Sequence, residues 1–412
     1  MGKDLATAPA HPWLPLGLAE QRFLLACLRQ NGTVPSPPAD LNWPALTRRA
    51  SGDGLGPLLF QRFKNAPELL PAATLDQFKR NYYQNLSANH IRWRELERIG
   101  RHLAQHDIPL LVLKGAALSI TIYSDPALRF MGDLDVAVPP EQAAEALALL
   151  QADGYEVEEH TELETAGLDD LELLRQQGWH VRLARLVHGK QVDLEFHWPL
   201  RQQVLVNQVA RLDVQQVWAT AVPLKSEANL WQPAPATMLL HLCLHAGLQH
   251  RFSDLGLRHY LDVDRLLRRH RREPGFWELF VAQVRAARAS HTSYFCLLLA
   301  QRLLGTPLPA EVMAELAPPA WKRRLFDEHF TTADVMNRTR AFYDSRRAWW
   351  RLLTIERPAD LLLGPLQALF PGPRYLANYY RTQSTGRLIA YTLWHPFHTL
   401  GRAGRRRWKR RP

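Results

Sequence analysis

The sequence has no long hydrophobic run and only three cysteines. No apolar stretch approaches the ~18 residues that a helix needs to span a bilayer, although 46% of the 412 residues are hydrophobic. Cys27, Cys243 and Cys296 lack the spacing of a metal site or a disulfide framework, which favours a reducing, cytoplasmic location. Residues 1–13 show no charged start followed by an apolar core, so we expect no signal peptide. These absences argue against a membrane-spanning protein and against a small disulfide-stabilised one.

Acidic residues are missing from the C-terminal end. The net charge is +11, but residues 401–412 hold six Arg and one Lys with no acid, so the remaining 400 residues carry only +4. This distribution argues against a protein that binds nucleic acid over its whole surface. We expect the tail to be mobile. Because it follows the apolar segment Leu388–Leu400, we also expect it to contact a polyanion, either RNA or an anionic membrane surface.

The expected elements divide the chain into four regions. A length of 412 residues is enough for two or three domains. The pattern predicts a helical layer over residues 1–95, an α/β core over 96–215, a helical domain over 216–330, and a helical segment over 331–412 that ends in the basic tail. The predicted fold class is α+β, with a small mixed β-sheet core and flanking helices embedded in a mostly helical protein.

A buried strand followed by a turn opens the core. Ile108–Leu113 is an unbroken apolar run, too short for an isolated helix, which predicts a buried strand. Lys114 and Gly115 follow it, and we expect Gly115 to let the backbone turn sharply before a helix over residues 116–123.

Two acids then lie close together on a second expected strand. Residues 133–138 alternate with period two, so Asp133 and Asp135 share one face. Adjacent carboxylates repel each other unless a cation lies between them, and a hard divalent ion suits oxygen ligands. An exposed strand face that binds nothing is the simpler alternative for these two residues taken alone.

A later hairpin supplies further acids. The β-rich runs 180–187 and 191–198 are joined by His188-Gly189-Lys190, which predicts a tight turn. In the second run Asp193, Glu195 and His197 share one face. Alternation does not distinguish Asp193 from Glu195 as a third carboxylate.

These features form a recognisable set. The glycine turn, the Asp-x-Asp strand and the later acidic strand resemble the polymerase β-like nucleotidyltransferase superfamily. More closely, LKGAAL at 113–118, the run Arg129–Val138 and LEFHW at 194–198 resemble a bacterial family described as uncharacterised nucleotidyltransferases. Its pattern is Lys-Gly, then Arg-x-x-x-Asp-h-Asp, then acid-h-His-Trp, where h is apolar. The likeness covers most of residues 20–270.

The resemblance implies a metal-dependent enzyme. It would transfer a nucleoside monophosphate, most simply AMP from ATP or another NTP, to an unidentified acceptor that is a small molecule, a protein or RNA. Two Mg²⁺ ions would assist the transfer. The family pattern places its acid two residues before the histidine, which favours Glu195 over Asp193. The implied catalytic residues and metal ligands are Asp133, Asp135 and Glu195, with Asp193 as the alternative ligand. The implied nucleotide-binding residues are Lys114, Gly115, Ala116, Arg129 and His197.

Some of these residues have alternative structural roles. Lys114 and Arg129 could neutralise a triphosphate or pair with neighbouring carboxylates. Trp198 could stack on the nucleotide base or be a buried core residue. A further group, consisting of His241, His245 and Asp262, could hold a metal or simply pack between two helices.

The turn departs from the superfamily pattern. Gly115-Ala116 stands where Gly-Ser or Gly-Gly is usual, so a hydroxyl that would contact phosphate is missing. A catalytically degenerate nucleotide- or RNA-binding module therefore remains an alternative. A purely structural helical protein, which would show no nucleotide-dependent thermal shift, is the third option.

Overall fold

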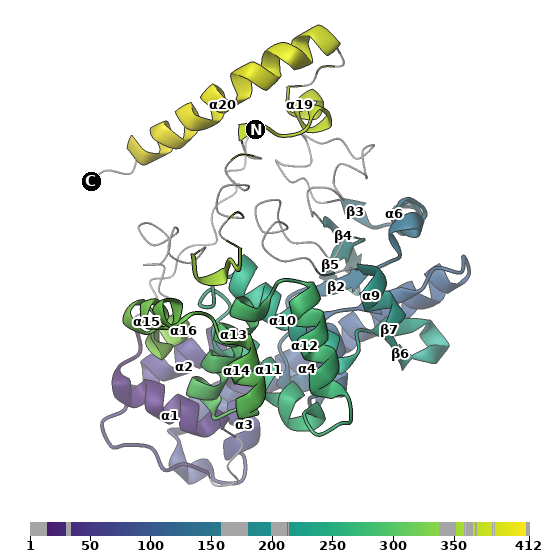
Figure 1. Ribbon diagram of the computed structural model, residues 1–412. Helices are drawn as coiled ribbons and strands as arrows, with labels where there is room; N and C mark the ends of the chain where they lie inside the picture. The colour runs from purple at the N-terminus through teal and green to yellow at the C-terminus, as the bar shows by residue number, and fades with distance from the viewer. Residues whose placement is uncertain are drawn as a thin grey trace.

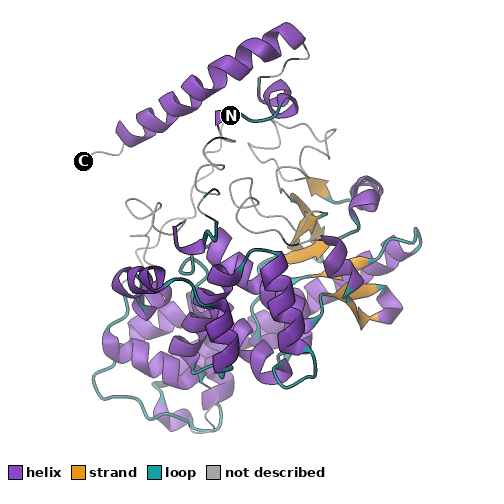
Figure 2. Cartoon of the chain, in the orientation of Figure 1, coloured by secondary structure: helices purple, strands orange, loops and turns teal. Residues whose placement is uncertain are grey.

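The computed structural model describes most of the chain, and its described residues confirm the α+β class. One mixed seven-stranded sheet is flanked by many helices (Figures 1 and 2). The described ranges are 15–29, 34–157, 180–198, 214–337, 352–357, 369–380 and 384–408, with the single residues 212, 359, 366 and 382. The acidic segment 160–178 lies outside them.

The N-terminal helices pack on one long helix. The amphipathic pattern of residues 74–106 predicts one long helix or two. The structure shows a single helix, α4, at Ala72–Ala104, and both α2 and α3 contact it. Asn42 immediately precedes α2 and caps it, because its side chain accepts a hydrogen bond from the amide of Ala45 at 3.0 Å. The helices before α4 are α1 (Leu18–Leu28), α2 (Trp43–Gly52), α3 (Gly56–Phe63) and the 3₁₀ turn η1 (Pro67–Leu69).

The strands of the sheet lie in the order β3-β4-β5-β2-β1-β7-β6. β2 runs parallel to β5 and antiparallel to β1, and β1 runs parallel to β7. In chain order the strands are β1 (Leu110–Val112), β2 (Leu134–Ala137), β3 (Glu156–Val157), β4 (Val181–Val187), β5 (Lys190–His197), β6 (Val222–Lys225) and β7 (Leu230–Gln232).

Local sequence explains the hairpin but not the far edge of the sheet. His188 and Gly189 have φ of +48° and +72°, the left-handed conformation that a two-residue β-turn requires. β6 and β7 lie beyond the expected 96–215 core. They are short, and Pro223 interrupts the β pattern, so neither gives a periodic signal.

Helices cover the sheet and extend from it. Those inside and after the core are α5 (Lys114–Thr121), η2 (Pro126–Leu128), η3 (Pro140–Gln142), α6 (Ala143–Ala152), α9 (Val214–Ala219), η4 (Ser226–Ala228), α10 (Pro235–Leu244), α11 (Leu257–His270), α12 (Phe276–Ala286), α13 (Ser290–Leu304), α14 (Ala310–Leu316), α15 (Ala320–His329) and α16 (Thr332–Asn337). A π-helical segment, η5 (His245–Gln249), continues α10. None of the described helices is both long and apolar enough to cross a membrane.

The C-terminal segment contains more helix than its composition suggests. α20 (Thr385–Trp408) includes much of the basic tail, so this part of the tail is helical, while residues 409–412 lie outside the described ranges. The mobility of the tail stays a prediction. α20 packs on α19 (Pro373–Tyr379), where Tyr380 stacks on Tyr391 with ring centroids 4.0 Å apart.

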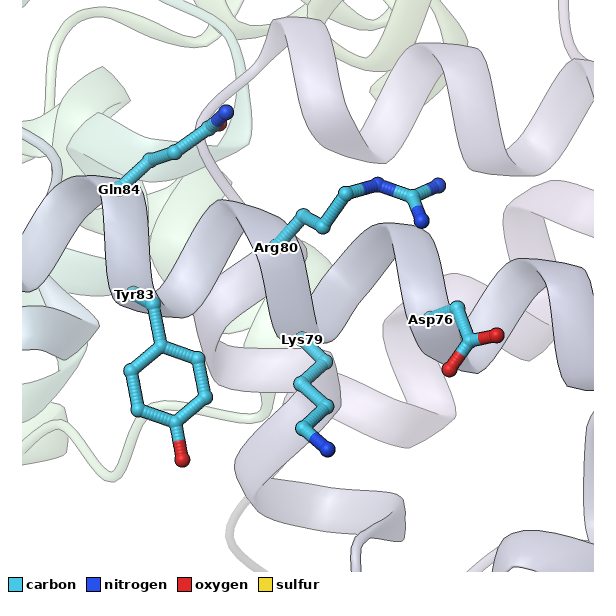
Figure 3. A pocket seen from close by; sticks show the side chains of 5 residues that line it. All are labelled: Asp76, Lys79, Arg80, Tyr83 and Gln84. Atoms are coloured by element: carbon cyan, nitrogen blue, oxygen red, sulfur yellow. The ribbon is translucent and has the colours of Figure 1, made fainter.

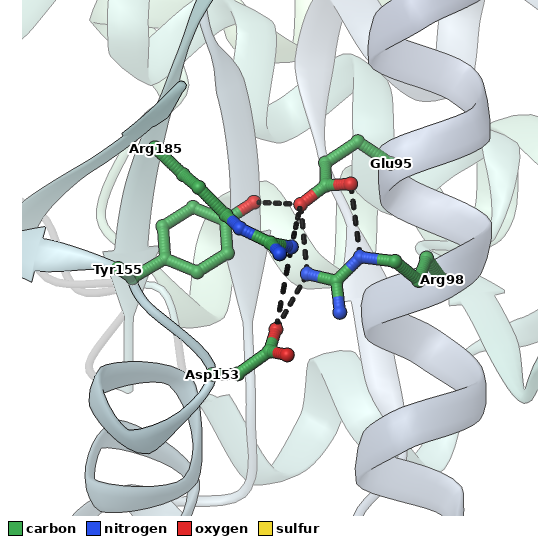
Figure 4. A network of polar contacts seen from close by, with 5 residues as sticks. All are labelled: Glu95, Arg98, Asp153, Tyr155 and Arg185. Carbon is green, nitrogen blue, oxygen red and sulfur yellow. Dashed lines mark hydrogen bonds and ion pairs between the residues drawn. The ribbon is translucent and has the colours of Figure 1, made fainter. Parts of the chain in front are cut away.

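A buried carboxylate ties α4 to the edge of the sheet (Figure 4). Glu95 is 3% exposed and accepts hydrogen bonds from Arg98 at 2.8 and 2.9 Å, from the Tyr155 hydroxyl at 2.8 Å and from Arg185 of β4 at 3.0 Å. Burial alone would raise the pKa of Glu95, but the hydrogen bonds from Arg98, Tyr155 and Arg185 lower it below its usual value. The ionised carboxylate therefore stabilises the fold.

Glu95→Gln tests this network. Breaking a buried ion pair is costly, but Arg98 and Arg185 keep 33% and 29% exposure. We therefore expect a loss of about 2 kcal/mol in the free energy of unfolding at pH 7. Because the folded-state pKa is depressed, the wild-type advantage should be complete above pH 4.5 and decline as pH falls through the lower, folded-state pKa. Urea unfolding across pH measures it. Exposed Glu141→Gln is the control, and an equal loss there would contradict the assignment.

Candidate active site

Two carboxylates lie opposite each other at the centre of the sheet. Asp135 on β2 is directly in register with Glu195 on the parallel neighbour β5. All residues of β2 are buried, and Asp135 is 7% exposed. We call Asp135 and Glu195 the acid pair. The half-buried Asp133 immediately precedes β2, two residues before Asp135, and its charge interacts with that of Asp135.

Asp193 lies elsewhere on the same strand. It pairs in register with Ala184 of β4, and continuing the β2–β5 register by one residue places it level with Asp133, just before β2. Its Oδ1 accepts a hydrogen bond of 2.6 Å from Gln191. The structure therefore brings Glu195 to Asp135 and leaves Asp193 one pleat away, toward the hairpin turn.

Lys114 neutralises the acid pair. Its Nζ donates to Asp135 Oδ1 at 2.6 Å and lies 4.0 Å from Glu195 Oε2. Lys114 is the first residue of α5 and has φ +44°, a strained conformation for a residue with a side chain. Such strain persists only where the surroundings enforce it, and here it directs the ammonium group to the carboxylates.

Gly115 serves a different purpose from the one expected. The positive φ belongs to Lys114, and Gly115 is not among the residues in the left-handed region. Instead, a Cβ on Gly115 would lie 3.2–3.3 Å from the guanidinium of Arg129. The expectation that the chain turns through a special conformation of Gly115 is thus wrong. A larger side chain at Gly115 would instead crowd the guanidinium of Arg129, and the buried Ala116 follows in α5.

Arg129 is held by an acid from the helical region. Its Nε and Nη2 donate to Asp262 of α11 at 2.7–3.1 Å, and the Tyr123 hydroxyl donates to the same carboxylate at 2.8 Å. Asn89 of α4 donates to the carbonyl of Arg129 at 2.8 Å. Of the alternatives for Arg129, the structure therefore shows pairing with a carboxylate.

Two histidines flank Glu195. His197 Nε2 lies 3.8 Å from Glu195 Oε2 and 3.4 Å from Asp135 Oδ1, and His180 Nε2 lies 3.6 Å from Glu195 Oε1. Arg182 donates to the same Oε1 at 3.1 Å. Within the described part of the chain, the buried Nε2 of His197 has no hydrogen-bond partner.

Sequence reasoning missed His180, although a signal was present. The hairpin pairs Val187 with Lys190 and Val181 with Phe196. The same register places His180 beside His197 on the face that carries Glu195. The two imidazole centroids are 4.9 Å apart.

The two carboxyl groups of the acid pair have pKa values shifted in opposite directions. Burial would raise the pKa of Asp135, but Lys114 and the approach of His197 hold it far below its usual value. Burial and then the charge of Asp135 raise the pKa of Glu195 to about 7. Asp135 is therefore the permanent anion, and Glu195 exchanges a proton near neutral pH. Burial lowers the pKa of His180 to about 3 and also depresses that of His197, so both imidazoles are neutral.

A second layer of histidines lies on the helical side. His241 is buried, and its Nε2 has no partner among the described residues. Burial, followed by the charge of Lys114, lowers the pKa of His241 to about 3. The His241 and His245 rings stack 6.3 Å apart. Asp262 pairs with Arg129 rather than with these rings. Of the described residues, the group with three converging metal donors is His180, Glu195 and His197.

Other features near the site have structural roles. Trp198 is 1% exposed, which indicates a core residue and not a stacking surface.

A shallow hollow of about 300 Å³ lies on α4, and its lining comes from that helix alone: Asp76, Lys79, Arg80, Tyr83 and Gln84 (Figure 3). One helix face cannot enclose a ligand, so the hollow is no candidate site.

Comparison with known proteins agrees with this geometry. A family model described as "Uncharacterised nucleotidyltransferase" matches residues 39–305, more than half of the chain. The matched range contains the acid pair, Lys114, Arg129 and Asp262. No curated protein and no solved structure matches the chain.

Glu195→Gln in chelator-treated protein tests whether Glu195 gains and loses a proton near neutral pH. Because the folded-state pKa is raised from 4.5 to about 7, the unfolded state binds fewer protons between these values, and wild-type stability falls as pH rises through that window. The variant mimics the protonated form, so at pH 8 its free energy of unfolding should exceed that of wild type by about 2 kcal/mol. That difference should disappear below pH 4.5.

The matched control is Asp193→Asn, which removes one negative charge from the same strand away from Asp135. Urea unfolding at several pH values should show no pH-dependent gain for it. If the free energy of unfolding depended on pH in the same way in both variants, the assignment of the raised pKa to Glu195 would be refuted.

Proposed function

The chain belongs to the uncharacterised nucleotidyltransferase family, and we propose that it transfers a nucleoside monophosphate, in the simplest case AMP from ATP, to an acceptor at the acid pair. The carrying observation is the register of Asp135 and Glu195 on parallel strands, with a lysine between them. The arrangement supports the likeness to polymerase β-like nucleotidyltransferases, which also place acids on adjacent strands beside a turn.

The carboxylates fit divalent metal ions. Asp133, Asp135 and Glu195 would hold Mg²⁺, which when bound neutralises phosphate oxygens and aligns the α-phosphate with the acceptor. The oxygen-rich side of the site, which contains Asp133 and Asp135, suits this hard cation. Glu195 would also help to deprotonate the acceptor hydroxyl.

Lys114 and Arg129 take different roles. Lys114 Nζ is the cation that balances the acid pair in the protein alone, and a nucleotide would offer it a second set of anionic oxygens within the reach of its flexible stem. Arg129 is engaged by Asp262, so we assign it to holding the Gly115 turn. The backbone amides of Gly115 and Ala116, at the start of α5, would receive phosphate oxygens.

A label-transfer assay tests the reaction. The full chain is incubated with Mg²⁺, a cell extract, and ATP labelled at either the α- or the γ-phosphate. Retention of the α-label alone is expected. Asp135→Asn and Glu195→Gln should lower transfer by on the order of 100-fold or more, because metal-held positioning supplies most of the catalysis. Asp193→Asn should cost about tenfold or less, equivalent to ~1.4 kcal/mol.

The outcomes separate the candidate reactions. Retention of the γ-label alone would indicate a kinase and overturn the proposal. Saturable ATP binding without retention of either label would favour a degenerate nucleotide-binding module, to which the missing hydroxyl at Ala116 points. A larger loss in Asp193→Asn than in Glu195→Gln would move the third carboxylate to Asp193.

The C-terminal helix supports a second, separate proposal. Ile389, Leu393 and Phe397 recur every four residues on one face of α20, and all are exposed, Leu393 and Phe397 at 69% each. The same helix carries four arginines between residues 402 and 407. An apolar ridge next to basic charge is typical of helices that lie on anionic lipid. We therefore favour a membrane surface over RNA as the polyanion that this helix contacts.

Removal of residues 401–412 tests the contact. Binding to vesicles that contain phosphatidylserine should fall at least about tenfold, because each basic residue near an anionic surface contributes about 1 kcal/mol. The melting temperature should stay nearly unchanged. Phe397→Ser should weaken vesicle binding while leaving the charge intact. Unaltered vesicle binding after truncation would exclude the tail, and binding to RNA but not to vesicles would exclude the membrane.

A further inference from the structure

The Glu195 side of the site offers nitrogen as well as oxygen donors. His180, Glu195 and His197 each present one ligand atom, and these atoms all lie within 4.8 Å of one another. His180 Nε2 lies 3.6 Å from Oε1 of Glu195, and His197 Nε2 lies 3.8 Å from Oε2. The carboxylate thus lies between two imidazoles.

These separations approach those of a metal ligand set. Donors about 2.1 Å from a tetrahedral ion are roughly 3.4 Å apart. The two histidine–carboxylate pairs are within a few tenths of an ångström of that separation, although they use different oxygens of Glu195. The most distant donors of the set, within 4.8 Å, would have to approach by up to about 1.4 Å. All three side chains are partly shielded, at 34%, 14% and 14% exposure for His180, Glu195 and His197. A shielded site of this kind holds a ligand set in place better than an exposed acidic cluster does.

The competing contacts leave this donor set available. Arg182 shares Oε1 of Glu195, but its side chain is 44% exposed and has room to turn toward solvent. Lys114 is 4.0 Å from Glu195 and bonds to Asp135 instead. The buried Nε2 of His197, unpartnered within the described ranges, is a polar atom that a metal would satisfy.

We infer that His180, Glu195 and His197 bind one divalent ion of the nitrogen-preferring class, such as Zn²⁺ or Co²⁺, with Glu195 shared between this ion and the Mg²⁺ that Asp133 and Asp135 would hold. Two imidazoles and a carboxylate suit first-row transition metals, whereas Mg²⁺ favours oxygen and retains water. The inference rests on the proposed function only in placing this ion beside the nucleotide, since the binding itself is a property of the three side chains.

Metal binding to the full chain, freed of metal by chelation, tests the inference. Isothermal titration with ZnCl₂ and MgCl₂ should give a Zn²⁺ dissociation constant at least about 100-fold below that for Mg²⁺. His180→Gln and His197→Gln should each weaken Zn²⁺ binding by about tenfold or more, with Mg²⁺ affinity changed less than about twofold. Exposed His106→Gln is the matched control and should bind Zn²⁺ as wild type does.

A second measurement does not depend on the variants folding. X-ray absorption of the wild-type chain loaded with one Zn²⁺ should show scattering from two imidazoles. A metal site without imidazole, or unchanged Zn²⁺ affinity in both histidine variants, would overturn the inference. Label transfer with Mg²⁺ together with unchanged Zn²⁺ affinity in those variants would reject this inference and leave the proposed function standing. Histidine-dependent Zn²⁺ binding without label transfer under any metal would support this inference and reject the proposed function.

Discussion

A buried and a half-buried carboxylate on neighbouring parallel strands impose the main electrostatic constraint on this structure. Asp135 and Glu195 face each other where the sheet is most enclosed, and two anions in so poorly hydrated a place repel strongly. The ammonium group of Lys114 offsets this repulsion. The backbone of Lys114 is then in the strained left-handed conformation. The protonation of Glu195 removes what remains of the repulsion in the protein alone.

The helical regions hold the loops that serve this pair. Asp262, on a helix far along the chain, fixes the guanidinium of Arg129 above Gly115. From the opposite direction, Asn89 of α4 fixes the backbone of the same arginine through its carbonyl. Further along α4, the carboxylate of Glu95 accepts a hydrogen bond from Arg185 of β4 and so connects that helix to the strand. A displacement of α4 would therefore move the strand that carries Arg182 and the loop that carries Arg129 together, so the large helical part of the chain supports the geometry of a small sheet.

The sequence was sufficient where periodicity and turn chemistry agree. The strand at 110–112, the hairpin with its His188-Gly189 turn and the long helix at 72–104 all follow from local patterns. It was insufficient where tertiary contacts decide. Nothing local indicates that Gly115 accommodates a guanidinium from 14 residues away, or that β7 completes the sheet beside β1 after a separation of more than 100 residues. Likewise, the basic composition of residues 401–412 does not predict that α20 continues through them to Trp408.

The choice between Asp193 and Glu195 shows why register matters more than residue type. Both acids share one face of β5, and strand rise separates them by about 6.6 Å, so only pairing with β2 distinguishes their surroundings. β2 is short and its Asp135 falls opposite Glu195. The antiparallel register of β4 then brings Arg182 to the same carboxylate and His180 to the next position. Once a two-residue turn at 188–189 is accepted, that second register follows from counting outward along the hairpin. The parallel register cannot be counted in this way, because no short turn links β2 to β5 and only the fold aligns them.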